Sequence, residues 1–317
     1  MMRSARLSVR KKSAPDAGWF AKGASRVHSR ARTVVMVCVI ALLTARLASA
    51  EDIRYLKTAP TDILDIYKDN SADYRDATEI GARIVNLHEY GTFFVYWLPP
   101  DFESLEEKRV LVILHGQNGN AYRHLVDFCQ TAMREKIGII SVQWGWPNAT
   151  FRGTPDRRIV NWAKSYTYLP SDIVYEIMST ALEHMEYRHG INKHLSAWHG
   201  FSKSSTDCVL YAFYDTYTEN DYFRLFIVAS GEADPNQKVI PELKAGIYGD
   251  KPLRDKNFYL WCGMKDGNRC QTMQSTKELV EALGGTVQIF RSGPEGRGGF
   301  ENSEDHQKEA VTLWKSL

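Results

Sequence analysis

Short apolar runs separated by helix-patterned segments are the feature that most constrains how this 317-residue chain can fold. Three of these runs, at residues 109–114, 137–142 and 225–229, are almost continuously apolar and show no alternation with polar residues. Strands of that kind are usually buried on both faces, as in a parallel sheet. A sheet covered on only one face would need alternating residues, so the runs favour a sheet covered on both.

The remaining segments extend this pattern. Further strands are expected at 83–87, 92–98, 195–198, 258–262 and 287–290, and helices at 125–136, 171–188, 204–217, 275–283 and 307–314. For the second of these helices, Ser171 is a suitable N-cap and Gly190 a suitable stop. Strands that alternate with helices predict an α/β fold: a mostly parallel, doubly wound sheet of about eight strands with helices on both faces.

The first 50 residues differ from the rest. They hold ten of the 40 Lys and Arg residues and only one of the 38 acidic residues, Asp16. Their apolar run at 33–43 is too short to span a bilayer, and small residues at Ala48 and Ala50 follow it. We expect an export signal that is cleaved before Glu51, leaving a secreted or periplasmic chain with no stable membrane span. An uncleaved anchor is the alternative.

Residues 51–317 are long enough for one large domain. By subtraction they hold 30 basic and 37 acidic residues, a net charge of −7. An acidic body repels phosphate backbones, so nucleic acid is not an expected partner. The oligomeric state cannot be read from these residues.

Four cysteines follow the signal: Cys129, Cys208, Cys262 and Cys270. An even number in an exported chain permits disulfides, and Cys262 and Cys270 are close enough in sequence to close a small loop. Buried free thiols are the alternative. The spacing of Cys and His does not suggest a metal site, so we expect neither a metal nor a cofactor.

An aromatic segment interrupts the alternation at about 144–170. It sets several tryptophans and tyrosines among glycine, proline and arginine, and we interpret it as an irregular insertion resembling a lid. Trp144 and Trp146 are candidates to line a substrate pocket, because flat rings offer a large apolar contact area. A packed loop that covers an edge of the sheet explains the same residues equally well.

The segment 196–205 carries the strongest chemical signal. Gly200-Phe201-Ser202-Lys203-Ser204 lies where a predicted strand gives way to a helix, in the pattern of a nucleophile elbow. The sharp turn of such an elbow brings strand and helix close together, so the residues around the nucleophile must be small. Ser204 replaces the usual closing glycine.

A serine nucleophile needs a base, and the base needs an acid to orient it. His306 is the only histidine after Ser202, and it follows a glycine-rich loop. Asp266, directly beyond the strand at 258–262, is the preferred acid, and Asp234 after the preceding strand is the second choice. Asp305 is adjacent to His306 and would not readily reach the imidazole ring.

The negative charge that develops on an attacked carbonyl must be met by N–H donors. The backbone N–H of Lys203, which follows the nucleophile, is one candidate. The second is the backbone N–H of Gln117, in the glycine-containing loop that follows the strand at 109–114. Taken alone, this loop would be an ordinary turn.

The order Leu114-His115-Gly116, Gly-x-Ser-x-Ser, Asp266 and His306 resembles the α/β-hydrolase superfamily over residues 80–317. Within it, the chain is similar to secreted bacterial feruloyl and acetylxylan esterases and to the polyhydroxybutyrate-depolymerase-like group. The resemblance implies a catalytic triad of Ser202, Asp266 and His306, with oxyanion donors at Gln117 and Lys203. Ser204 departs from the family pattern, and this departure bears on the choice of subfamily more than on the expected reaction.

The expected function is therefore that of a secreted serine hydrolase that cleaves carboxylic esters, either small molecules or esters linked to a polymer. Two alternatives stay open. A peptidase of the same fold would use the same triad, and a non-catalytic binding protein could be built on a hydrolase scaffold. The intact order of serine, aspartate and histidine argues against the second alternative.

Overall fold

The computed structural model describes residues 71–87, 90–147, 160–163 and 166–317. The predicted export signal, its cleavage site and the centre of the aromatic insertion lie outside these residues. None of the described helices is both long enough and apolar enough to cross a membrane.

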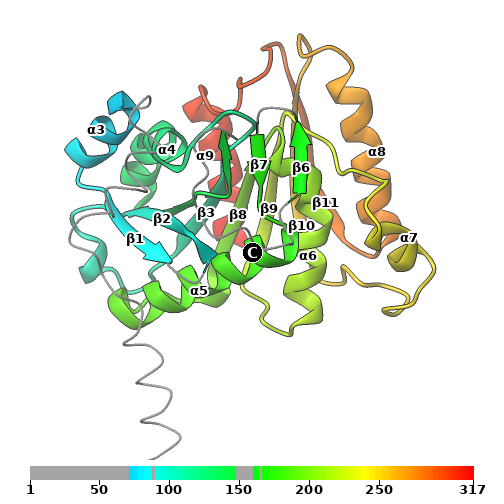
Figure 1. The fold of residues 1–317 in the computed structure, drawn as a ribbon, viewed down its shortest axis with the longest axis horizontal. Helices are drawn as coiled ribbons and strands as arrows, with labels where there is room; N and C mark the ends of the chain where they lie inside the picture. The colour runs from blue at the N-terminus through cyan, green and yellow to red at the C-terminus, as the bar shows by residue number, and fades with distance from the viewer. Residues whose placement is uncertain (1–70, 88–89, 148–159, 164–165) are drawn as a thin grey trace, which may run out of the picture. The chain divides into compact units, whose positions relative to one another are not determined.

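An eight-stranded sheet forms the centre of the described chain (Figure 1), in the order β1-β2-β4-β3-β8-β9-β10-β11. The strands from β4 to β11 in this order run parallel, whereas β2 is antiparallel to both of its neighbours. Their bounds are Arg83–Leu87 (β1), Thr92–Trp97 (β2), Val110–Leu114 (β3), Gly138–Val142 (β4), Ser196–Phe201 (β8), Phe223–Ala229 (β9), Asn257–Gly263 (β10) and Thr286–Gly293 (β11). The strands predicted at 83–87 and 92–98 are confirmed, and they pair with each other in antiparallel fashion.

Helices cover both faces of the sheet. Helices α4 and α9 pack against each other on one face, α5 and α6 pack against each other on the opposite face, and α8 packs against β10 and β11. The α-helices are α3 (Ser71–Glu79), α4 (Ala121–Glu135), α5 (Ser171–His189), α6 (Cys208–Tyr217), α7 (Val239–Lys244), α8 (Arg269–Ala282) and α9 (Glu304–Ser316), and the short 3₁₀ turns are η3 (Phe102–Ser104), η4 (Lys193–Leu195) and η5 (Ser204–Asp207). The predicted doubly wound, mostly parallel sheet is confirmed.

The aromatic insertion is more regular than its composition suggests. Strands β5 (Gly145–Pro147), β6 (Val160–Ala163) and β7 (Tyr166–Tyr168) form a separate antiparallel sheet in the order β5-β7-β6. Alternating aromatic residues suit such strands. The expectation of a wholly irregular segment is therefore wrong for the part that the structure describes.

Two helix ends test the predicted capping residues. Gly190 ends α5 with a left-handed backbone (φ 62°), as expected for a glycine C-cap. Ser171, however, is not the N-cap, because Pro170 occupies that position and Ser171 is the first helical residue. The Ser171 hydroxyl instead donates to the carboxylate of Asp207, at 2.8 Å. Proline supplies the extended backbone that precedes a helix, so the expected cap moved by one residue.

A disulfide joins Cys262 at the end of β10 to Cys270 in the first turn of α8, with the Cα atoms 5.1 Å apart. Cys129 and Cys208 are free thiols. The bond closes the short loop that contains Asp266, so it fixes the connection that follows β10. Of the two alternatives for the cysteines, the structure contains both: one bridge and two free thiols.

Candidate active site

Ser202 occupies the turn between β8 and η5 at the carboxyl edge of the sheet. Its backbone is in the left-handed region (φ 55°), and its amide donates to the carbonyl oxygen of Ala229 on β9 at 2.9 Å. A positive φ is costly for a residue with a side chain and is retained where surrounding contacts enforce it. The turn therefore has the strained strand-to-helix geometry expected of a nucleophile elbow.

Ser204 explains how the elbow closes without its usual glycine. Its buried hydroxyl accepts from the Phe201 amide at 2.8 Å and lies 2.8 Å from the Leu114 carbonyl oxygen, to which it donates. These bonds tie the end of β8 to the end of β3. A glycine would leave both backbone groups without this partner, so serine is an active part of the turn.

Close backbone approach is instead provided by glycines on neighbouring segments. A Cβ atom at Gly231, just after β9, would lie 2.3 Å from the Ser202 carbonyl oxygen and 2.6 Å from the Ser205 Cβ. A Cβ atom at Gly116 would lie 2.8 Å from a ring carbon of Phe201. The elbow is therefore packed between the loops that follow β3 and β9, and only glycine fits at both positions.

The loops that follow β10 and β11 are joined by backbone hydrogen bonds. The Met264 amide donates to the Gly293 carbonyl at 2.8 Å, and the Lys265 amide donates to the Glu295 carbonyl at 3.0 Å. A Cβ atom at Gly263 would lie 2.6 Å from the Glu295 carbonyl oxygen. Asp266 on the first loop and Glu295 and Arg297 on the second are consequently held at the same edge of the sheet as Ser202.

His306 is the third residue of α9, whose N-cap is Ser303. It was expected just before the terminal helix, and the helix starts earlier because the Ser303 hydroxyl caps it. The His306 Nε2 atom lies 3.6 Å from Glu295 Oε1, and its ring centroid is 5.5 Å from that of the buried Trp261. The predicted base is thus placed by a helix N-terminus, an aromatic ring and a carboxylate.

The Ser202 hydroxyl oxygen accepts a hydrogen bond from the guanidinium group of Arg297. Among the described residues, no hydrogen bond connects Ser202 with His306, or His306 with Asp266. Asp266 is half-buried, and its Oδ2 atom is buried without a hydrogen-bond partner. Ser202 and His306 each contact a residue of the loop 293–299, Arg297 and Glu295 respectively. The hydrogen bonds of the predicted triad are not formed in this structure.

Glu295 and Arg297 were missed by the sequence analysis. Both lie in the glycine-rich loop between β11 and α9, where glycines drew attention to the loop itself and away from the charged residues in it. The sequence does contain a hint of their involvement, because two residues of opposite charge lie two positions apart, within twelve residues of His306. Asp234, the second candidate for the acid, instead caps its own turn by accepting from the Asn236 amide at 2.9 Å.

The loop after β3 adjoins the elbow, because Leu114 pairs with Gly200 of β8. Gln117 is exposed there, and no hydrogen bond engages its amide in the described part of the chain. Its donor is therefore available to a ligand, as the oxyanion role requires. The amide of Lys203 follows Ser202 directly in the turn, and its role stays a prediction.

The side chain of His115 supports this loop through hydrogen bonds. Its Nδ1 lies 2.8 Å from the Gly116 carbonyl oxygen, which can only accept, so Nδ1 carries the proton and Nε2 accepts from the Gln143 amide at 3.1 Å. Burial lowers the pKa of His115 to about 4. A neutral, fully buried imidazole with both ring nitrogens engaged is a structural support for the loop.

A second buried histidine connects the strand of Ser202 to the segment that leads to His306. The Nε2 atom of His199, on β8, lies 3.3 Å from Glu301 Oε1, and both side chains are buried. The Glu301 carbonyl in turn accepts from the side-chain amide of Gln307 at 2.8 Å. These contacts connect the start of α9 with the strand that leads to Ser202.

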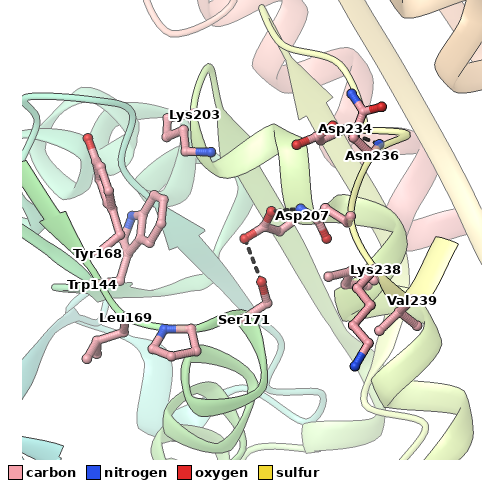
Figure 2. A pocket seen from close by; sticks show the side chains of 13 residues that line it. Trp144, Tyr168, Leu169, Ser171, Lys203, Asp207, Asp234, Asn236, Lys238 and Val239 are labelled. Carbon is pink, nitrogen blue, oxygen red and sulfur yellow. Dashed lines mark hydrogen bonds between the residues drawn. The ribbon is translucent and has the colours of Figure 1, made fainter. Parts of the chain in front are cut away.

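A cavity of about 410 Å³ is lined in part by Lys203, the residue that follows the predicted nucleophile (Figure 2). Lys203 forms part of one wall, and Trp144 and Tyr168 of the aromatic insertion form another. Trp144 therefore lines a cavity beside the elbow, whereas Trp146 lies in β5 with its side chain outside what the structure describes. The use of either residue in binding substrate stays a prediction.

The floor of this cavity is polar. The Asp207 carboxylate accepts from the Ser171 hydroxyl, drawn as a dashed line in Figure 2, and from the Gln237 side-chain amide. Because its acceptors are already engaged, Asp207 shapes the cavity and is poorly placed to act as a base. In the described residues, no three His, Cys, Asp or Glu side chains gather in a way that would hold a metal ion.

Comparison with known proteins supports the fold assignment. No family model and no curated protein matches the sequence. Among solved structures, one of two fungal esterases from Rhizomucor miehei matches with a TM-score of 0.51 and 12% identity, over 86% of this chain and 94% of the other. A hyperthermophilic esterase from the archaeon Pyrobaculum calidifontis matches with a TM-score of 0.53 and 12% identity, over 81% and 92%.

An arylesterase matches with a TM-score of 0.52 and 10% identity, over 77% of this chain and 88% of the other. These likenesses agree with the strand order and the antiparallel β2. The chain has the α/β-hydrolase fold. At these identities, the similarity extends to the α/β-hydrolase fold and not to a subfamily within it.

Proposed function

We propose that the protein is a serine hydrolase that cleaves carboxylic esters through an acyl-enzyme on Ser202. The observation that carries the proposal is the left-handed backbone of Ser202 at the strand-to-helix turn, with His306 in the first turn of α9, which follows the loop whose Arg297 contacts Ser202. In an α/β-hydrolase fold this position presents a hydroxyl to ligands at the carboxyl edge of the sheet.

In the proposed reaction the Ser202 oxygen attacks the ester carbonyl while His306 takes the hydroxyl proton. The tetrahedral oxyanion is held by the backbone N–H groups of Gln117 and Lys203. Collapse of the intermediate breaks the bond to the alcohol, which leaves with the proton from His306. A water molecule then repeats the sequence on the acyl-enzyme and releases the acid.

The proposal requires one rearrangement and a choice between two acids. The Arg297 guanidinium has to leave the Ser202 oxygen so that the His306 ring can reach it. The acid that orients His306 is Glu295 or Asp266: Glu295 is the carboxylate beside the ring in this structure, and Asp266 is the one that the family pattern selects. Arg297 is exposed, so its side chain has solvent to move into when it leaves Ser202.

The cavity beside Lys203 is the proposed binding site for part of the substrate, with Trp144 on its wall. The fold resemblance to proteins described as esterases makes esters the first substrates to assay. Feruloyl, acetylxylan and polyhydroxybutyrate esters are the finer possibilities. A peptidase of this fold would differ mainly in its cleft, and a binding protein would lack turnover.

Export and secretion or periplasmic localisation complete the proposal. They rest on the basic, apolar and small-residue pattern of residues 1–50. Edman sequencing or intact mass of the mature protein tests this part, with Glu51 as the expected first residue. A mature chain that retains residues 1–50 would support the anchor.

Assay of aryl, acetylxylan, short-chain hydroxybutyrate and peptide substrates tests the reaction class. The account predicts turnover of at least one ester, lost by about 10³-fold or more in Ser202→Ala with an unchanged far-UV circular dichroism spectrum. Exclusive cleavage of peptide amides would favour the peptidase. Equal rates for the protein and the Ser202→Ala variant would contradict the proposal.

A further inference from the structure

Arg297 is placed unusually for a charged side chain. Neighbouring arginines are paired with carboxylates: Arg269 with Glu232 and Arg291 with Glu309. Arg297 has no carboxylate within ion-pair distance among the described residues, and its guanidinium contacts the Ser202 hydroxyl instead. A cation whose only described hydrogen-bond partner is the proposed nucleophile has donors left for a ligand, since a guanidinium carries five.

Lysine residues also occur on the segments around Arg297. Lys203 follows Ser202 in the turn, and the Cβ of Lys265 lies 3.9 Å from the position that a Cβ would take at Gly296. The nearby carboxylate of Glu295 is directed at His306, with its Oε2 buried.

We propose that Arg297 is a specificity-determining residue that binds a carboxylate of the substrate close to the scissile carbonyl. The inference rests on the proposed esterase function and narrows its substrate class to esters with a carboxylate in the acyl or the alcohol part. The planar guanidinium matches a carboxylate through two parallel N–H···O bonds. Binding of that carboxylate draws the guanidinium from the Ser202 oxygen and leaves the oxygen to His306.

Matched pairs of esters test the proposal on each side of the scissile bond. The acyl-side pair is the 4-nitrophenyl hemiester of glutaric acid and its methyl ester, with spontaneous hydrolysis subtracted. The alcohol-side pair is 3-carboxyphenyl butyrate and 3-carbamoylphenyl butyrate. The quantity measured is the ratio of kcat/KM for the anionic member to kcat/KM for the neutral member.

For the unaltered protein we expect this ratio to favour the anionic member in at least one pair. Arg297→Gln should lower the ratio by about tenfold or more, the scale expected for loss of a charge-assisted hydrogen bond, and Arg297→Lys by less. Arg254→Gln is the matched control: Arg254 is exposed and precedes β10, at the opposite end of that strand from the active site. It removes the same charge and should leave the ratio as it was.

Labelling by a fluorophosphonate separates failure of this proposal from failure of the proposed function. If Ser202 of the unaltered protein forms no adduct, the hydrolase function itself fails. If Ser202 is labelled but Arg297→Gln leaves the ratio unchanged, or slows both members of each pair equally, the carboxylate role is overturned. Equal slowing would make Arg297 a general contributor to turnover with no selectivity for charge.

Discussion

His306 Nε2 lies 3.6 Å from Glu295 Oε1, and Glu295 belongs to the same loop whose Arg297 contacts Ser202. One short segment thus holds a carboxylate beside the proposed base and a cation on the proposed nucleophile. Asp266, the acid implied by the family resemblance, lies on the neighbouring loop with a buried oxygen that has no hydrogen-bond partner. The two loops are hydrogen-bonded to each other, which holds Asp266 on the segment next to Glu295.

Glu295→Gln and Asp266→Asn identify the acid. We expect Glu295→Gln to lower kcat by about 10²-fold or more, because the amide cannot stabilise the imidazolium that forms during attack. Asp266→Asn should reduce kcat less. Steady-state kinetics on an aryl ester, with folding checked by circular dichroism, gives the comparison, and a larger loss in Asp266→Asn would return the role to Asp266.

Gly231→Ala should be strongly destabilising, because the added Cβ would lie 2.3 Å from the Ser202 carbonyl oxygen, a backbone atom that cannot rotate away. We expect a loss of about 3 kcal/mol in the free energy of unfolding, or failure to fold. Gly296→Ala is the matched control, since its nearest described atom would be 3.9 Å away. Urea denaturation measures both, and similar stabilities for the two variants would contradict the packing described for the elbow.

Stability should fall as the pH drops from about 6.5 to 4. Burial lowers the pKa of His115 and of His184 to about 4, so between these pH values the unfolded chain binds protons that the folded chain does not. The lowered pKa of His115 reduces the free energy of unfolding by about 3 kcal/mol once the pH is below 4. Asp127 acts oppositely, because burial raises its pKa to about 6, but burial also lowers the pKa of His124, so one group acts against three.

Urea titrations at several pH values check this expectation. His115→Gln should flatten the acid side of the stability profile, whereas His194→Gln, at an exposed position, should keep its slope. An unchanged slope in His115→Gln would mean that His115 is not the neutral, buried group described here.

Removing the disulfide tests how firmly the loop after β10 is held. The Cys262→Ala, Cys270→Ala double variant should lose about 2.5 kcal/mol of stability, as expected for a cross-link that closes a loop of this length. Differential scanning calorimetry with and without reductant measures the effect on the unaltered protein. A variant as stable as the oxidised protein would show that the bridge is dispensable.

Most strands could be predicted because continuous apolar runs mark buried β-structure. Their ends were harder to predict: β8 was expected to stop at Trp198, yet it continues through His199 and Gly200 to Phe201. A histidine and a glycine interrupt an apolar pattern, although in the sheet His199 is buried beside Glu301 and Gly200 makes room for the Trp198 ring. Helices α3 and α7 were missed because both are short and weakly patterned.

The candidate site could be predicted only in part. Ser202 is marked by a local motif and His306 by being the last histidine, but contacts between loops leave no local trace in the sequence. The backbone pairing of the two loops places Arg297 against Ser202, which lies 95 residues earlier in the chain. It also places Glu295 against His306, which lies 11 residues later. Local spacing can nominate a nucleophile, but it cannot show which side chains surround it.

Fluorophosphonate labelling followed by peptide mass spectrometry tests the central claim most directly. The account predicts one covalent adduct per chain, located on Ser202, absent from Ser202→Ala and formed more slowly in His306→Ala. Labelling of Ser204 or Ser205 in place of Ser202, or no adduct in a protein shown to be folded, would contradict the assignment of Ser202 as the nucleophile.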